Sequence, residues 1–152
     1  MTDTKVSWTI AGRVARIPSA FEHAHKDPVS AIRPLVSVVD DDESVRESLP
    51  DLLHELGYDV RSFSSAEGFL ASDCLDQTRC LILDIAMPGM TGPDLQLELA
   101  RRGRGIPIVF VTAHPEENLR MLVLERGAVA LLYKPFSEAA LLEALRAAHP
   151  TA

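Results

Sequence analysis

From Leu35 onward, the hydrophobic and polar positions follow two alternating patterns. Short apolar or β-branched runs predict strands, and the stretches between them carry apolar residues at helical spacing. The predicted strands cover 35–39, 58–63, 80–84, 106–112 and 130–133, and the predicted helices cover 44–56, 66–72, 93–102, 115–126 and 138–149. Five successive strand–helix units imply the α/β class, with a parallel sheet covered by helices on both faces.

The first 34 residues lack a clear period and contain three prolines. We expect a flexible N-terminal extension over 1–34, a domain over 35–149 and a short tail over 150–152. Some apolar residues of the extension do fall at helical spacing, so a docking helix remains an alternative. These residues are Ile10, Val14, Ile17 and Phe21.

Composition limits the class of protein. The chain has 152 residues, 47% hydrophobic and 24% charged, which suits one domain of roughly 100–150 residues. No apolar run approaches the ~20 residues that cross a bilayer, and the N-terminus lacks the apolar core of a signal peptide, so we expect a cytoplasmic protein without membrane contact. Cys74 and Cys80 make no disulfide framework, and Cys80, which opens an apolar run, is expected to be a buried thiol.

The net charge of −7 is unevenly distributed. Residues 1–34 hold five basic and three acidic side chains, about +2, so the remainder carries about −9. An acidic body repels nucleic-acid phosphates, and we therefore expect no direct contact with nucleic acid.

Chemically active side chains follow the ends of four predicted strands. They are Asp40 and Asp41 after the first strand, Asp84 at the end of the third, Thr112 at the end of the fourth, and Lys134 after the fifth. Each alone has an ordinary explanation as a helix cap or a loop residue. Because functional groups of such sheets gather beyond the carboxyl ends of the strands, the set predicts a site there. Asp42 and Glu43 are expected to begin the next helix.

Four segments carry a resemblance to a known family. They are VVDDDESVRESL (38–49), LILDIAMPGMTGPDL (81–95), VFVTAH (109–114) and LLYKPFSEAALLEAL (131–145). In order and spacing they resemble the receiver domain of bacterial two-component response regulators, of the FixJ-like and CheY-like kind. The resemblance implies a flavodoxin-like (βα)5 fold, a doubly wound parallel sheet with strand order 2-1-3-4-5.

The resemblance also implies how a phosphoryl group would be held. Asp84 would be the phosphoacceptor, attacking a phosphohistidine of a sensor histidine kinase or a phosphotransfer protein to form an aspartyl phosphate. Lys134 would contact the phosphate, and Thr112 would donate a hydrogen bond to a phosphoryl oxygen. Pro135 is expected to follow a cis peptide bond.

A divalent cation belongs to the same implied site. Asp40, Asp41 and Asp84, with the backbone carbonyl of Ala86, would hold Mg²⁺ or Mn²⁺, because these cations favour oxygen ligands. The cation would offset the repulsion between the carboxylates and the entering phosphoryl group.

Other positions depart from the family pattern or tune it. Leu131, three residues before the lysine, stands where a switch aromatic residue is usual, so a different readout is expected. Tyr133 is expected on the opposite face of the strand, as a poor substitute. Ala86 and His114 occupy the positions that tune phosphoryl lifetime. Ala86 positions no water, whereas His114 either positions one or caps the turn before Pro115.

The fourth predicted helix carries apolar residues around most of its circumference, more than one sheet can cover. They are Leu119, Met121, Leu122, Val123 and Leu124. We expect Met121 or Leu122, with Leu131 nearby, at an interface for a homodimer or an output protein. In this family the face formed by the fourth helix, fifth strand and fifth helix commonly serves that purpose.

Three functions compete. The first is a stand-alone response regulator, a phosphoacceptor switch that catalyses only its own phosphotransfer and acts through protein contacts. The second is a degenerate receiver that is never phosphorylated and serves as a binding module. The third is a hydrolase working through an aspartyl phosphate, which needs a second aspartate where this chain has Ala86. Since only three residues follow the last helix, no output domain is expected, unless the sequence is part of a longer protein.

Overall fold

The computed structural model describes residues 33–148. Nearly all of the predicted extension over 1–34, the tail over 150–152 and the last residue of the final predicted helix lie outside the described residues. The helical spacing from Ile10 to Phe21 lies there too.

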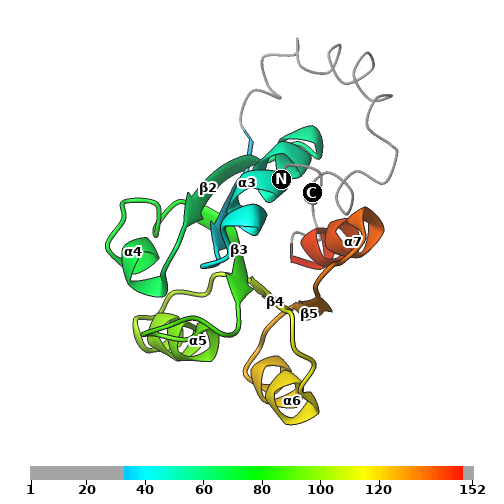
Figure 1. Cartoon of the computed structure of the whole chain (residues 1–152). Coiled ribbons are helices and arrows are strands. Elements are labelled where there is room, and N and C mark those ends of the chain that lie inside the picture. The colour runs from blue at the N-terminus through cyan, green and yellow to red at the C-terminus, as the bar shows by residue number, and fades with distance from the viewer. Residues whose placement is uncertain (1–32, 149–152) are drawn as a thin grey trace.

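Within the described residues, five parallel strands form one sheet (Figure 1). They are β1 (Leu35–Val39), β2 (Asp59–Phe63), β3 (Thr78–Asp84), β4 (Ile108–Thr112) and β5 (Ala130–Tyr133). Their pairings give the order β2-β1-β3-β4-β5. This confirms the predicted fold class and strand order.

Helices cover both faces of the sheet. They are α3 (Glu43–Glu55), α4 (Ala66–Leu70), α5 (Gly92–Arg101), α6 (Glu117–Glu125) and α7 (Glu138–Ala148). Figure 1 shows α3 and α7 on one side of the sheet and α4, α5 and α6 on the other. None of the helices between residues 33 and 148 has the length and apolar character needed to cross a membrane.

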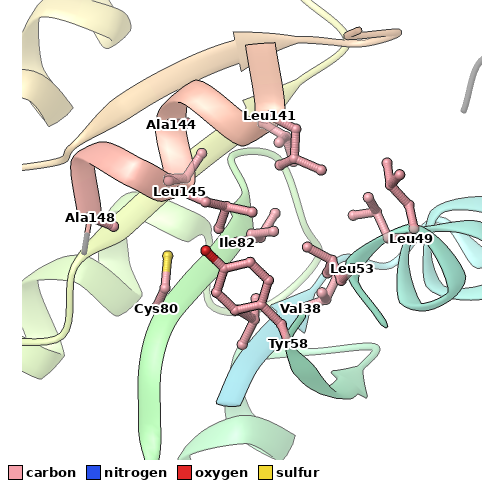
Figure 2. Close-up of a cluster of buried hydrophobic side chains, with 14 of the residues drawn as sticks. Val38, Leu49, Leu53, Tyr58, Cys80, Ile82, Leu141, Ala144, Leu145 and Ala148 are labelled. Carbon is pink, nitrogen blue, oxygen red and sulfur yellow. The ribbon is translucent and has the colours of Figure 1, made fainter. Parts of the chain in front are cut away.

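Two apolar cores separate the sheet from its helices, because alternate strand residues point to opposite faces. Val36 and Val38 of β1 join the core beneath α3 and α7, whereas Val39 joins the core beneath α4, α5 and α6. Figure 2 shows part of the first core, in which residues of α7 lie over β1 and β3. Strands β1, β3 and β4 are buried on both faces and read as apolar runs, which is why the sequence showed them clearly.

Some element boundaries differ from the predictions by a few residues, and two of them lie next to a proline. Strand β4 begins at Ile108 rather than 106, because Pro107 has no N–H to give to the ladder. Helix α6 begins at Glu117, so the predicted start at Pro115 is wrong. Glu116 is extended at its N-cap, with φ −148° and no side-chain cap. Helix α4 ends at Leu70, two residues earlier than predicted.

Candidate functional site

Asp40 follows β1 at the carboxyl edge of the sheet, the edge where all five strands end. It is fully buried, and its Oδ1 accepts the N–H of Asp42 at 2.9 Å. Its backbone is held on both sides, because its N–H donates to Phe63 O at 3.1 Å and its carbonyl accepts Arg46 Nη1 at 2.9 Å. The Asp40 carboxylate therefore has a fixed position.

Asp84 ends β3, the strand next to β1. Its side chain is only 8% exposed. The loop that follows returns to it closely, since the N–H of Gly92 donates to Ile85 O at 3.0 Å. A Cβ on Gly92 would lie 2.3 Å from the Asp84 carbonyl oxygen, so only glycine fits at this position.

Lys134 follows β5, across the sheet, and brings a cation to the two carboxylates. Its Nζ lies 2.9 Å from Asp40 Oδ2 and 3.9 Å from Asp84 Oδ1. The side chain is 16% exposed, so the ammonium is largely removed from solvent. The structure thus brings three predicted site residues together from β1, β3 and β5.

The charges at this edge do not balance. Burial, and next the negative charge of Asp40, raise the pKa of the Asp84 carboxyl to about 7, against the opposing effect of Lys134. Hydrogen bonding with the Asp40 and Asp41 carboxyls acts in the same direction as burial. One ammonium is therefore insufficient for this group of acids, and a further cation would favour their ionised forms.

Asp40, Asp41 and Asp84 fit a divalent cation. One carboxylate oxygen of each lies within 4.8 Å of the others. Asp40 Oδ2 is buried and forms an ion pair with Lys134 Nζ at 2.9 Å. A set of three carboxylates with a single ammonium beside it suits a hard cation such as Mg²⁺ or Mn²⁺.

Thr112 ends β4 beside Asp84, because Val111 pairs with Asp84 in the ladder. Its hydroxyl is engaged locally: Oγ1 accepts the N–H of His114 at 3.1 Å and donates to His114 O at 3.3 Å. His114 is exposed, and its backbone, rather than its imidazole, forms these contacts with Thr112.

Two cavities of the protein lie away from this site, at the amino ends of the strands. One, of about 490 Å³, is lined by Leu35 and Asp59 among others. The other, of about 530 Å³, is lined by Ile108 and Val129 among others. Neither includes the acidic residues or Lys134. The candidate site therefore lies apart from both of these cavities.

The acidic run divides as the sequence suggested. Asp42 is the N-cap of α3, with Oδ1 accepting the N–H of Ser44 at 3.0 Å. Glu43 is the first residue of that helix. The peptide bond before Pro135 is cis, as expected.

The expectation about Tyr133 is wrong. Leu131 lies opposite Phe110 and Tyr133 lies opposite Thr112 in the β4–β5 ladder. Residues two apart in a strand share a face, so Tyr133 is on the same face as Leu131. Leu131 packs partly buried against the core beneath α6, and Tyr133 is 39% exposed.

On α6, Met121 is 56% exposed and Leu122 is partly buried. The surplus apolar surface predicted for this helix therefore reduces mainly to Met121, since Val123 is buried and Leu119 packs against the core. The interface predicted for Met121 or Leu122 stays a prediction.

Several residues near the site were not predicted. Arg46 holds the backbone of Asp40, and Gly92 allows the close return of the chain to Asp84. Glu67 of α4 accepts the N–H of Met90 at 3.0 Å in the loop that follows Asp84. Arg46 and Gly92 lie inside the recognised motifs and could have been found there, whereas the sequence near Glu67 gave no such signal.

Comparison with known proteins identifies the family. Residues 36–146 match the family model of the response regulator receiver domain. The chain belongs to this family. Nodulation protein W of Bradyrhizobium diazoefficiens is 42% identical over 119 residues, which is 78% of this chain and 52% of that protein. The chain spans about half the length of the curated relatives it matches.

Solved receiver structures agree with the fold. The response regulator StyR shares 46% sequence identity with a TM-score of 0.70, over 76% of this chain and 58% of that one. FixJ-N shares 32% identity with a TM-score of 0.70, over 80% of this chain and 97% of that one. Such relatives are response regulators of two-component systems. Their receivers act as signalling switches rather than enzymes, and they meet histidine kinases or phosphotransfer proteins.

Proposed function

We propose that this receiver accepts a phosphoryl group on Asp84 from a sensor histidine kinase or a phosphotransfer protein, in a Mg²⁺-dependent reaction. The observation that carries the proposal is the position of the Asp84 carboxylate, beside the Asp40 carboxylate and 3.9 Å from Lys134 Nζ. A buried carboxylate is a poor nucleophile when protonated. Lys134 favours the ionised form of Asp84, and a divalent cation held by the three aspartates would add the further positive charge that ionisation needs.

The residues would share the work as follows. An Asp84 oxygen attacks the phosphorus while the P–N bond to the donor histidine breaks, giving an aspartyl phosphate. The donor ring leaves as a neutral imidazole when its other nitrogen carries a proton. Asp40, Asp41 and Asp84, with the Ala86 carbonyl, would hold the Mg²⁺ or Mn²⁺, which neutralises charge on the phosphoryl oxygens. Lys134 would donate a hydrogen bond to a phosphoryl oxygen.

Thr112 would have to exchange partners. Its hydroxyl donates to His114 O before phosphorylation. Donation to a phosphoryl oxygen would break that contact, freeing the β4–α6 loop to shift toward the site. His114 and Ala86 would then flank the phosphoryl group and affect its lifetime.

The output is proposed to be protein contacts made by the domain over 35–149. Met121, Leu122 and Leu131 would contribute to a surface on α6 and β5 for a second copy or an output protein. The acidic body supports contacts with protein rather than nucleic acid.

Labelling with ³²P-acetyl phosphate and Mg²⁺ tests the chemistry. We expect an acid-stable, base-labile label that is lost in Asp84→Asn and after chelation of the metal. Asp51→Asn, an exposed aspartate on α3, is the matched control and should label normally. An Asp84→Asn protein that still takes the label would overturn the assignment.

A degenerate binding module is the second candidate, and Leu131 is the observation that favours it. An aliphatic side chain lacks the aromatic ring that, in the usual family pattern, changes position with the threonine. If the wild-type protein takes no label from acetyl phosphate or from a labelled kinase, the binding module becomes the better proposal.

A further inference from the structure

The loop between β3 and α5 has fixed ends and an exposed middle. Ile85 and Met87 are each only 6% exposed, and the N–H of Gly92 donates to Ile85 O at 3.0 Å. Ala86, which lies between these two residues, is exposed, and so is Gly89, which lies between Met87 and Gly92. Because the Ala86 carbonyl is a proposed metal ligand, the conformation of this stretch matters to the site.

The middle of the loop is held from outside by Glu67 of α4. The N–H of Met90 donates to Glu67 Oε2 at 3.0 Å. Gly89 has φ +74°, and a Cβ at this position would lie 2.9 Å from the same carboxylate oxygen. The carboxylate therefore rests directly against the turn, and the turn fits beneath it because residue 89 is glycine.

Helix α4 gives this contact a firm base although the Glu67 side chain is exposed. Ala66 and Phe69 are fully buried on the sheet, and Ser65 Oγ accepts the N–H of Gly68 at 3.0 Å. Glu67 thus extends from an anchored turn of helix. A hydrogen bond to a carboxylate is also stronger than one to a neutral acceptor.

We propose that Glu67 is a positioning residue for the Asp84 site. By holding the N–H of Met90, it keeps the β3–α5 loop in the conformation that presents the Ala86 carbonyl beside Asp84. This inference rests on the proposed function, because it concerns the Mg²⁺ site that the proposed function requires. It assigns to α4 a part in that site, although α4 contributes no ligand.

The test is Mg²⁺ affinity, measured by titrating ¹⁵N-labelled protein and following backbone amides by NMR. Glu67→Ala should shift the Met90 amide signal and weaken Mg²⁺ binding by roughly tenfold, the usual effect of losing a group that orients a ligand. Glu67→Gln keeps an acceptor of the same length and should bind Mg²⁺ within about threefold of wild type. Glu143→Ala, an exposed glutamate on α7, is the control and should change neither readout.

A second variant approaches the same contact sterically. Gly89→Ala should also weaken Mg²⁺ binding, because its Cβ displaces the Glu67 carboxylate. Once Glu67 is alanine, the Gly89→Ala change has only its own backbone strain to add, so the double variant should lose less affinity than the sum of the two single losses.

Normal Mg²⁺ affinity in Glu67→Ala, with a shifted Met90 amide, would overturn the inference, because the hydrogen bond would then have been lost without any effect on the metal site. Failure of the proposed phosphorylation can be told apart from failure of the inference about Glu67. A wild-type protein that binds Mg²⁺ but takes no phosphoryl label would refute phosphorylation, while the affinities of the variants would still decide the role of Glu67.

Discussion

Cys80 is a buried thiol whose surroundings change its pKa. The sequence predicted a buried thiol, and Cys80 is fully buried on β3. Figure 2 shows it beside Tyr58 and below α7. Burial raises the pKa of this thiol to about 12, and burial also raises the pKa of Tyr58.

These shifts predict sensitivity to alkali. A thiol with a raised folded-state pKa keeps its proton longer than the unfolded chain does, so its stabilising effect is lost as pH rises from about 9 toward 12. We expect Cys80 to lower the free energy of unfolding by about 1.5 kcal/mol between pH 7 and pH 10. Urea unfolding of wild type and Cys80→Val at both pH values measures this, and an equal fall in the two proteins would contradict it.

Lys134 predicts a second effect at this scale, because it is the ion-pair partner of a buried carboxylate. Lys134→Met should lower the free energy of unfolding by about 3 kcal/mol without metal, since Asp40 would be left buried and uncompensated. Urea denaturation measures the loss, and added Mg²⁺ should restore part of it.

The control for Lys134 is Arg120→Met. Arg120 pairs with Glu117 at 3.4 Å on the surface, where the two side chains are 41% and 66% exposed. Its loss should cost less than about 1 kcal/mol. Similar losses in the two variants would show that the buried pair has no special weight.

At this scale the sequence predicted that the charged residues converge, but it did not predict the contacts around them. Asp40, Asp84 and Lys134 were predictable because each follows a clear strand, and parallel strands bring their ends to one edge. The contact of Glu67 with Met90 joins residues 23 apart through two irregular segments, and no periodic pattern encodes it. The error over Tyr133 was one of strand alternation, which the sequence already contained.

At the scale of elements, the start of α5 is specified by its own residues. Thr91 Oγ1 accepts the N–H of Asp94 and the Asp94 carboxylate accepts the N–H of Thr91, both at 3.2 Å, which is a capping box. Gly92 then lies against the backbone of Asp84. The helix start and the acceptor strand are therefore packed as one unit.

Gly92→Ala should separate the start of α5 from the end of β3 at Asp84. Its Cβ would meet the Asp84 carbonyl oxygen at 2.3 Å and the Phe110 ring at 3.0 Å, and such overpacking typically costs about 1–3 kcal/mol. We expect that loss in thermal unfolding, with slower labelling of Asp84 at temperatures where the variant is folded. Gly105→Ala, with nothing within 4 Å of its added Cβ, should leave both unchanged. Normal labelling of a folded Gly92→Ala protein would show that the contact does not position Asp84.

Helix and strand types were predictable at this scale, whereas their ends were not. The apolar runs of β3 and β4 are unambiguous because both faces are buried. The start of α6 depends on how the chain leaves Thr112 and passes Pro115, and the hydroxyl contact of Thr112 with His114 fixes that turn. Such local hydrogen bonds are not visible in an apolar pattern.

For the molecule as a whole, Met121 is the residue that best tests an assembly. We expect the phosphorylated or beryllofluoride-bound protein to self-associate through α6 and β5. Met121→Gln should weaken this association by about tenfold while changing the free energy of unfolding by less than about 0.5 kcal/mol, because the side chain is mostly exposed.

Light scattering at several protein concentrations measures the association. Leu97→Gln, which alters an exposed apolar residue on α5 instead, is the matched control and should associate normally. A wild-type protein that stays monomeric both in the free form and in the phosphorylated or beryllofluoride-bound form would exclude a homodimer through this face. An output protein would then be the remaining partner.

The strand order has a consequence for synthesis. Asp40 and Asp84 end neighbouring strands, β1 and β3, whereas Lys134 follows β5, the last strand of the sheet. Domains are generally made from the N-terminus onward, so a growing chain would hold its acidic groups before the ammonium that offsets them. Until β5 joins the sheet, those acids lack their cation from within the chain. The capacity to take up phosphate is therefore expected only in a chain whose final strand has folded, and an unfinished chain would give no signal.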